Sequence, residues 1–457
     1  MATIIRKNED LLAVHLSVER RRDGLQLKAT LVRGEKRLRP PLSLPLKTLG
    51  YRARDQMVRA HQMSFPRPDL PPKLYALFFE ASQQASFGEP VWLQIDYGSD
   101  VLGAYPWEAK VGPEIGCTLL RIPNFARNTY VRGSSKDPIV ICAATPRAKG
   151  APDWRHAVKK LLKGFADFSL KMPIVLYVGH SDHLDAGFFE EYQDDYPELD
   201  ISLAPLPPSA EAPTRERFIS ERETLKNPWL QWISNDLGER FNGNAHAVHM
   251  ACSGYSQNAQ GALALPLSPT QDEDERWARF VGVPEFSHFA DALNCQIAGL
   301  TALGDKRWRE GLMLFANELS WKRPGVIVLD EGDGSASRVF DALLSGGSLY
   351  SSVVTNTVIS AHPQALFEDA SSTSVARSAR LLQAKRGGFG NSFMFLEAVE
   401  GLETARTEET PLPGELMRMM DMLSSSRPKS ALQAAQDQGT LNALEFLKNL
   451  PSEKGAR

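Results

Sequence analysis

Three short segments of this sequence carry side chains that could do chemistry. Gly179–His183 offers two imidazoles and a carboxylate, Cys252–Tyr255 offers a thiol and a phenol, and Asp330–Gly334 offers three carboxylates. A thiol acts as a nucleophile when a base within hydrogen-bond reach takes its proton, and clustered carboxylates can bind a hard cation. The segments therefore raise two kinds of chemistry, cysteine-based hydrolysis and metal-assisted hydrolysis.

Each segment follows an apolar run whose length suits a β-strand, and one further run precedes them. The four runs are Ile139–Cys142, Ile174–Val178, Ala245–Ala251 and Gly325–Leu329. Between the first two runs, apolar residues from Trp154 to Phe168 recur at helical spacing. A strand, a helix and a strand in this order form a right-handed unit of parallel strands that are buried on both faces. We therefore predict an α/β protein with one mostly parallel sheet flanked by helices, whose ligand-binding groups lie beyond the carboxyl ends of the strands.

Three parts of the chain together resemble the CHAT branch of the caspase-like cysteine proteases. Pro90–Ile95, followed by Tyr105–Ala109, is similar to the family's strand and its Leu-Pro-Trp-Glu type turn. Ala247–Tyr255 (AVHMACSGY) looks like the strand that ends in the family's catalytic His-Gly. Gly325–Asp333 (GVIVLDEGD) resembles the strand that ends in Ser-Ala-Cys-Glu-Thr-Gly. The resemblance covers residues from about 75 to about 400 and implies a caspase/CHAT-like fold.

The resemblance also implies that both members of the catalytic dyad are degenerate. Ser253 stands where the family has its histidine base, and Gly332 best matches the position of the nucleophilic cysteine. The resemblance therefore predicts that Ser253 and Gly332 lie near each other at the ends of adjacent strands. A glycine supplies no nucleophile, and a serine hydroxyl does not titrate near neutral pH. Loss of one member of such a catalytic unit costs on the order of 10⁶ in rate. We therefore expect no catalytic residue at these positions and no peptidase turnover.

The sheet and its helices determine the shape of a pocket at the strand ends, so the pocket can persist after the two catalytic side chains are lost. We predict that Ser253, Tyr255, Asp330 and Asp333 line a mouth that binds a peptide or a partner's loop. The expected function is that of a catalytically inactive, CHAT-like pseudoprotease acting as a binding or scaffolding subunit in a hetero-complex or homo-oligomer. The resemblance implies a bacterial regulatory or defence system as its setting, and neither a cofactor nor a metal is expected.

Two alternatives retain an activity. Cys252, beside Ser253, could be a displaced nucleophile, although adjacent strand residues point to opposite faces and a cysteine is commonly a small buried hydrophobe. Asp330, Glu331 and Asp333 could hold a metal ion for hydrolysis, although a polar turn with glycines explains the same residues more simply. The sequence thus leaves open whether the protein is an enzyme, and it favours a non-enzymatic function.

The polar segment near residue 180 is a weaker candidate. His180, Asp182, His183 and Asp185 are metal-type ligands, but their spacing matches no known site closely. We interpret them as a solvated loop at a strand end. A third alternative for the whole chain keeps only the fold and uses the pocket to sense a small ligand.

Composition and charge exclude several classes of protein. The 457 residues are 42% hydrophobic and 23% charged, as in an ordinary globular protein. The 52 basic and 55 acidic residues leave a net charge of -3, which gives no global case for binding nucleic acid or an anionic membrane. No apolar run approaches the roughly 18 residues that span a bilayer. Without a signal-type N-terminus or a CxxC pair, we expect a cytoplasmic protein.

The chain divides into three parts by pattern. Residues 1–72 are predicted to be rich in β-structure, because apolar residues alternate on both sides of the Asp23-Gly24 turn. Residues 73–400 form the predicted CHAT-like α/β domain, with its core at 136–400. Residues 401–457 are predicted to be a helical tail.

Overall fold

The computed structural model describes most of the chain between residues 11 and 361. The described ranges are 11–22, 24–34, 36–50, 69–85, 90–96, 100–122, 136–146, 153–185, 187–208, 227–257, 260–272, 278–304, 306–322, 325–344 and 357–361. They all belong to the first of two compact units, Met1–Leu381. The predicted helical tail, residues 401–457, lies outside the described residues.

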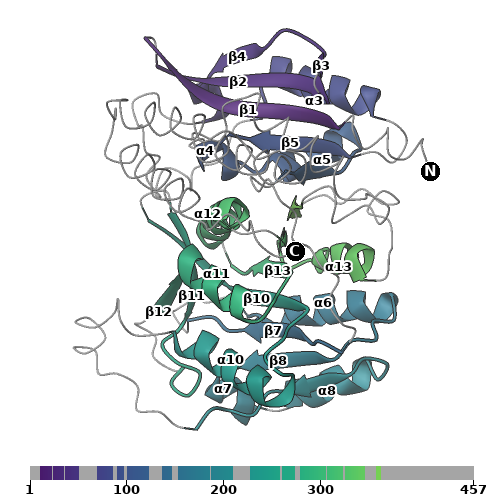
Figure 1. Cartoon of the computed structure of the whole chain (residues 1–457), viewed down its shortest axis with the longest axis vertical. Helices are drawn as coiled ribbons and strands as arrows, with labels where there is room; N and C mark the ends of the chain where they lie inside the picture. Colours follow the sequence, from purple (N-terminus) through teal and green to yellow (C-terminus); the bar gives the residue numbers. More distant parts are fainter. Residues whose placement is uncertain are drawn as a thin grey trace, which may run out of the picture. The chain divides into compact units, whose positions relative to one another are not determined.

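The described part is a mixed α/β structure built on a fifteen-stranded sheet, in agreement with the predicted fold class (Figure 1). Twelve strands follow one another in the order β3-β2-β1-β5-β6-β15-β14-β13-β10-β7-β8-β9. The strands are β1 (Leu12–Arg21), β2 (Gly24–Arg33), β3 (Lys36–Arg37), β4 (Leu42–Pro45), β5 (Val91–Ile95), β6 (Leu119–Arg121), β7 (Ile139–Ala143), β8 (Ile174–Val178), β9 (Ile201–Leu203), β10 (Ala247–Gln257), β11 (Gln260–Pro266), β12 (Ala278–Gly282), β13 (Ile297–Ala302), β14 (Val326–Asp330) and β15 (Val358–Ser360). Whether the fold is caspase-like or CHAT-like stays a prediction.

Helices connect and cover these strands. They are the short 3₁₀ helix η1 (Leu46–Leu49) and the α-helices α3 (Pro72–Gln84), α4 (Asp100–Gly103), α5 (Trp107–Ile115), α6 (Arg155–Asp167), α7 (His180–Leu184), α8 (Gly187–Asp195), α10 (Pro228–Arg240), α11 (Val283–Ala292), α12 (Lys306–Lys322) and α13 (Ala336–Leu344).

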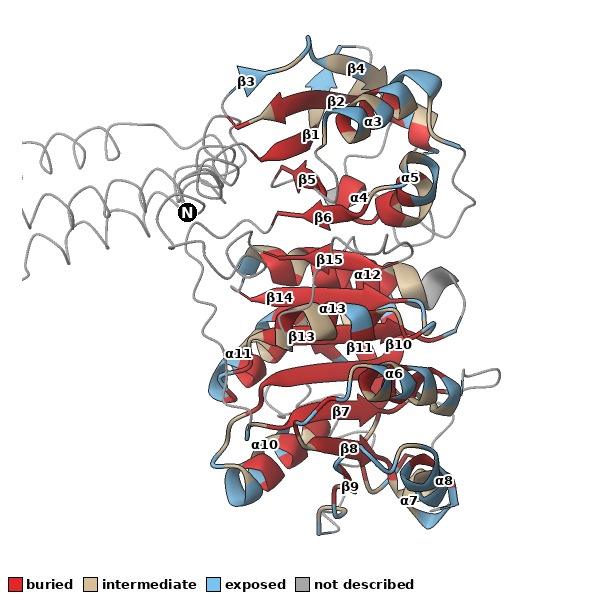
Figure 2. Cartoon of the chain, turned by 90° about the vertical axis from the view of Figure 1, so that its right-hand side faces the viewer, coloured by how far each residue is buried: buried red, intermediate tan, exposed pale blue. Residues whose placement is uncertain are grey.

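The prediction that four apolar runs lie in one mostly parallel sheet is confirmed. β8, β7, β10, β13 and β14 are neighbours in that order, and every pairing among them is parallel. All residues of β7, β8, β13 and β14 are buried, as Figure 2 shows by colour. Burial on both faces explains why β7, β8 and β14 arise from apolar runs in which apolar and polar residues do not alternate.

Each face of this parallel region packs against different helices. On one face, Val248, Met250 and Cys252 of β10 share a core with residues of α10, α11 and α12. We call this the first core. On the other face, His249 lies against Phe340 of α13, whose ring contacts Phe165 of α6. The sheet is therefore covered on both sides, as the βαβ pattern predicts.

The predicted N-terminal hairpin is also present. β1 pairs antiparallel with β2 from Leu12 to Arg21, and it pairs in parallel with β5. The hairpin and α3 share a second core, which includes Leu16, Leu77 and Leu314 of α12. The hairpin thus packs with elements on both sides of residue 72, while the division of the chain at residues 72 and 400 stays a prediction.

The turn that resembles Leu-Pro-Trp-Glu has a structural role at the start of α5. Glu108 accepts hydrogen bonds of 2.7 and 2.9 Å from the guanidinium of Arg121 on β6, and both side chains are buried. Trp107 Nε1 donates to the Leu102 carbonyl over 2.7 Å. The buried ion pair therefore ties α5 to β6.

Candidate functional site

The strand ends that carry the predicted dyad positions are not neighbours. β10 pairs with β13, which brings Cys252 opposite Ala302. β14 pairs with the other side of β13. We predicted Ser253 and Gly332 at the ends of adjacent strands, and this prediction is wrong because β13 lies between β10 and β14.

The strand end beside Ser253 belongs to β13, which the sequence pattern concealed. Gly299 and Thr301 interrupt its apolar run, so Ile297–Ala302 was not among the predicted strands. One residue beyond the last pair of the register, Ser253 and Leu303 follow on the two strands. Ser253 is 2% exposed and Leu303 is 5% exposed. Neither side chain can exchange a proton near neutral pH.

A buried hydrogen-bonded chain crosses the three strands just below their ends. The Thr301 hydroxyl donates to Asp330 Oδ1 over 2.7 Å, and His249 Nε2 lies 2.7 Å from the same hydroxyl oxygen. Because the hydroxyl has one proton and gives it to the carboxylate, His249 must donate from Nε2 and carry no proton on Nδ1. Within the described part of the chain, that Nδ1 has no hydrogen-bond partner.

A glycine makes room for this histidine. Gly299 of β13 lies directly opposite His249 in the register. A Cβ added at Gly299 would lie 2.2 Å from His249 Nδ1, closer than any real contact. The glycine that concealed β13 in the sequence is therefore required by the imidazole on the next strand.

Burial sets the charge states of His249 and Asp330, the two titratable groups in this hydrogen-bonded series. Burial lowers the pKa of His249 to about 3, so the imidazole is neutral. Burial raises the pKa of Asp330 to about 6, against hydrogen bonds from Thr301 and two backbone amides that stabilise its ionised form. Those amides belong to Gly332 and Ala336, at 3.1 and 3.2 Å. Asp330 thus anchors the turn and the start of α13, and at 1% exposure it does not line an open mouth.

The three carboxylates of the predicted acidic cluster have separate partners. Glu331 forms an ion pair with Arg309 of α12. Asp333 accepts hydrogen bonds from the Ser335 amide and hydroxyl, at 3.0 and 2.5 Å. No group of three or more His, Cys, Asp or Glu side chains among the described residues is arranged to hold a metal ion. The geometry therefore gives no support to metal-dependent hydrolysis at this turn.

Cys252 lies on the opposite face of β10, in the first core. Its side chain is fully buried with Cys142 and Met250. Burial raises the pKa of its thiol to about 12, against a hydrogen bond with the Ala264 backbone. A thiol with no access to solvent and a raised pKa is a poor nucleophile. The geometry therefore argues against Cys252 as a displaced catalytic cysteine.

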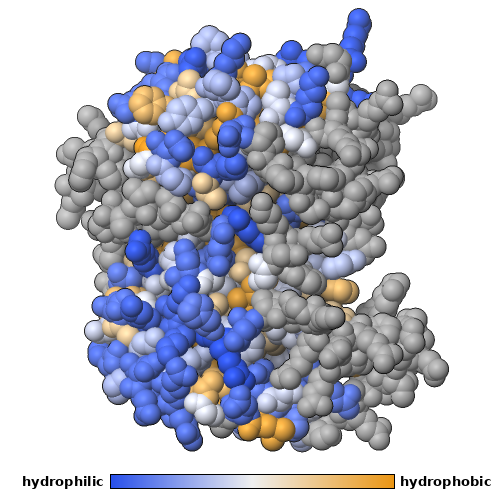
Figure 3. Space-filling view, turned by 180° about the vertical axis from the view of Figure 1, so that it is seen from behind, coloured by the Kyte–Doolittle hydropathy of each residue, from blue (hydrophilic) through white to orange (hydrophobic). Residues whose placement is uncertain are grey.

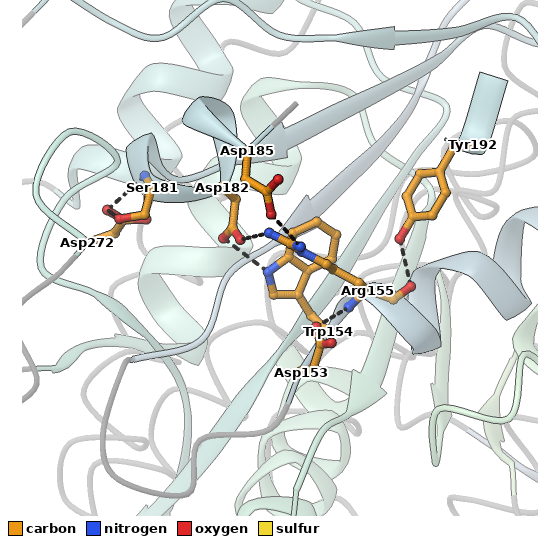
Figure 4. A network of polar contacts seen from close by, with 8 residues as sticks. All are labelled: Asp153, Trp154, Arg155, Ser181, Asp182, Asp185, Tyr192 and Asp272. Carbon is orange, nitrogen blue, oxygen red and sulfur yellow. Dashed lines mark hydrogen bonds and ion pairs between the residues drawn. The ribbon is translucent and has the colours of Figure 1, made fainter. Parts of the chain in front are cut away.

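The polar segment after β8 is occupied by structural contacts (Figure 4). Arg155 at the start of α6 pairs with Asp182 and Asp185 at 2.9 and 2.8 Å. Asp272 accepts hydrogen bonds from the amide and the hydroxyl of Ser181, the latter at 2.8 Å. His183 Nε2 lies 3.1 Å from the Ala204 carbonyl oxygen. These contacts join loops at the ends of β7 and β8 and leave no free set of metal ligands there.

The second half of β10 forms a three-stranded antiparallel sheet with β11 and β12, which we call the small sheet. An aromatic pair is exposed on this small sheet. Tyr255 of β10 and Phe280 of β12 stack with ring centroids 4.3 Å apart and an interplanar angle of 27°. Their residues are 37% and 46% exposed. The register places Ala262 and Ala264 of β11 between the two strands. These small side chains let the two rings meet across the middle strand.

The same outer face includes Ser253. Ser253, Ala264 and Phe280 are paired in one row across β10, β11 and β12, and Tyr255, Ala262 and Gly282 are paired in the next row. Residues two apart on a strand share a face. We call this the outer face of the small sheet. Phe280 was not among the predicted site residues, because apolar and polar residues do not alternate in Ala278–Gly282 (ARFVG) and the sequence therefore does not mark an exposed face.

Close backbone contact fixes the position of Tyr255. A Cβ at Gly311 of α12 would lie 2.6 Å from the Tyr255 backbone nitrogen, and one at Gly261 would lie 2.2 Å from the Gly311 carbonyl oxygen. The two glycines therefore allow α12 to pack directly on the backbones of β10 and β11.

No family model, curated protein or solved structure matches this chain. Among the described residues, the search for a helix of the length and hydrophobicity needed to cross a membrane found none.

Proposed function

We propose that this chain is a catalytically inactive, CHAT-like pseudoprotease that binds a protein partner through the outer face of its small sheet. The observation that carries the proposal is the row at the end of β10. There, Ser253 is buried and the residue that follows the adjacent strand β13 is the apolar Leu303, while the stacked pair of Tyr255 and Phe280 is exposed on the same face as Ser253.

The absence of turnover follows from the side chains at these strand ends. A cysteine peptidase needs a thiolate and a base within hydrogen-bond reach. With β13 next to β10, the residue that would stand in for the nucleophile is Leu303, not Gly332. His249 does not replace the lost base, because its ring is fully buried and its Nε2 is engaged with Thr301.

Binding is supported by the exposed aromatic pair. Aromatic side chains are enriched among the residues that dominate the energy of protein interfaces. The two stacked rings and the alanines of the middle strand β11 form an apolar surface, which suits an extended segment with an apolar side chain. Of the four predicted mouth residues, Tyr255 is the one that the outer face presents, because Ser253 and Asp330 are buried and Asp333 follows a strand that is two places away.

The family resemblance supports a bacterial regulatory or defence system as the setting. The cysteine pattern and the N-terminal sequence support the cytoplasm as the compartment.

The test compares capture of partners by matched variants of the tagged full-length chain. Tyr255→Ala and Phe280→Ala remove one ring each from the outer face. Phe79→Ala is the control, because Phe79 is also 46% exposed and stacks on Tyr75 of α3, outside the small sheet. We expect a protein that co-purifies with wild type from native lysate to be lost with the first two variants and retained with the third.

Two results would contradict the proposal. One is capture that all three variants leave unchanged. The other is cleavage of a peptide substrate by the wild-type chain, which would return a catalytic role to these strand ends.

A further inference from the structure

Charge is segregated to the two outer edges of the sheet. Residues 19–39 contain eight Lys and Arg against three Asp and Glu, whereas residues 187–203 contain six Asp and Glu and no Lys or Arg. The first segment includes β3, and the second includes α8 and β9. β3 and β9 are the first and last strands in the sheet order, and Figure 2 shows them at opposite ends of the described part.

The basic edge presents its charges to solvent. Arg20, Arg21 and Arg22 are exposed at the turn of the hairpin. Lys36, Arg37 and Arg39 are exposed on and after β3, which pairs with the other end of β2. Within this set, Arg21 pairs with Glu19, and Arg39 pairs with Glu80 of α3. Lys36 lies directly opposite Arg33 across β3 and β2. Like charges in opposite positions of a sheet are destabilising, so the local structure does not by itself favour this arrangement.

The acidic edge is equally exposed. Its exposed side chains are Glu190, Glu191, Asp194, Asp195, Glu198 and Asp200. Lys159 of α6 bridges two of them, Asp195 and Glu191, and the hydrogen bonds that its ammonium group donates to both raise its pKa. The other four carboxylates add to the negative charge beside β9. Hydrophilic side chains are visible at both ends of the face in Figure 3.

Protection of the sheet edges does not explain opposite signs. Charged side chains on edge strands prevent edge-to-edge association of sheets. Two edges of the same sign would repel each other in neighbouring copies, whereas a basic edge and an acidic edge attract. The pattern therefore favours association of one copy's basic edge with another copy's acidic edge.

We infer that this chain associates with itself head to tail, with the edge at β3 of one copy against the edge at α8 and β9 of the next. The second copy is the partner that the charges fit, because each edge finds its complement in the same chain. Such a contact joins different surfaces, so it can repeat into an open chain of copies. The outer face of the small sheet is not part of this contact, and the inference does not rest on the proposed function.

The test measures self-association of the full chain after nuclease treatment. Sedimentation velocity is recorded at about 0.01 M and about 1 M salt, where the Debye length falls from about 30 Å to about 3 Å. We expect oligomers that grow with protein concentration at low salt, and monomers at high salt.

Charge reversal at each edge then identifies the surfaces. One variant carries Arg22→Glu, Lys36→Glu and Arg37→Glu, and the other carries Glu190→Lys, Asp194→Lys and Glu198→Lys. We expect each variant alone to associate at least about tenfold more weakly than wild type, and an equimolar mixture to recover association. A control with Lys160→Glu, Lys163→Glu and Lys171→Glu changes the net charge as the first variant does, and it should still associate.

Several results would overturn the inference. These are a monomeric wild type at low salt, association that the edge variants or salt leave unchanged, and a mixture that fails to recover association. Oligomers that disappear on nuclease treatment would show that the basic edge binds a nucleic acid instead.

Discussion

The Thr301 hydroxyl forms hydrogen bonds with both His249 and Asp330 in the protein interior. It should therefore contribute much more to the free energy of unfolding than the Thr301 methyl group. Thr301→Val keeps the shape of the side chain and removes the hydroxyl. The carboxylate of Asp330 then loses a 2.7 Å hydrogen bond, and the Nε2 proton of His249 loses its acceptor. Both groups are at most 1% exposed, so water cannot replace the missing partner without rearrangement.

The expected magnitude follows from these two losses. A hydrogen bond to a charged group contributes about 1.5 to 3 kcal/mol, and an unsatisfied buried donor costs about 1 to 3 kcal/mol. We expect Thr301→Val to lower the free energy of unfolding by about 3 to 5 kcal/mol. Thr301→Ser keeps the hydroxyl and removes one buried methyl, which costs about 1 kcal/mol.

Urea unfolding of the full chain at neutral pH, followed by tryptophan fluorescence, compares the two variants with wild type. The reasoning requires Thr301→Val to be clearly less stable than Thr301→Ser. If the two variants unfold at the same urea concentration, the Thr301 hydroxyl does not form the stabilising hydrogen bonds with His249 and Asp330 that we describe.

Three further predictions concern the same region. Burial raises the pKa of Asp330 to about 6, so the folded state binds this proton more tightly than the unfolded chain, and the contribution of Asp330 to stability falls as the pH rises from about 4 to about 6. Relative to wild type, Asp330→Asn should therefore gain about 3 kcal/mol between about pH 4 and about pH 7 in urea unfolding, and a pH-independent difference would contradict this. Burial lowers the pKa of His249 to about 3, so its own contribution has the opposite sign and is lost as the pH falls below about 6.5. Gly299→Ala should displace the His249 ring and destabilise the fold by about 3 kcal/mol, whereas Gly238→Ala on α10, where a Cβ meets nothing within 4 Å, should not destabilise it; equal melting temperatures for the two variants would refute the close contact. Cys252 should resist iodoacetamide in the native protein and react after unfolding, because burial raises the pKa of its thiol to about 12, and rapid native labelling detected by mass spectrometry would restore it as a candidate nucleophile.

The sequence predicts secondary structure correctly where a pattern of residues is typical of a single structure. Runs such as Ile174–Val178 are apolar on both faces because both faces are covered, so the length and composition of the run were enough to predict a buried parallel strand. The Asp23-Gly24 turn between alternating segments was enough to predict the hairpin.

The candidate site was harder to predict because its decisive strand breaks the pattern. β13 contains Gly299, which the ring of His249 requires, and Thr301, which bonds to His249 and Asp330. Both residues serve neighbours that are far away in sequence, so no local pattern reveals them. Because the sequence pattern does not reveal β13, it predicts that β14 lies directly beside β10 and that Gly332 lies near Ser253.

The helix α12 has a consequence for how this molecule unfolds. Leu312, Met313 and Phe315 belong to the first core, and Leu314 between them belongs to the second. Consecutive residues of a helix point in different directions, so one helix forms a wall of both cores. Neither core can come apart without exposing a side of α12 to water. The two halves of the sheet should therefore lose their native structure in a single cooperative step, and the amides in the middle of α12 should exchange their hydrogens only when the whole described unit opens.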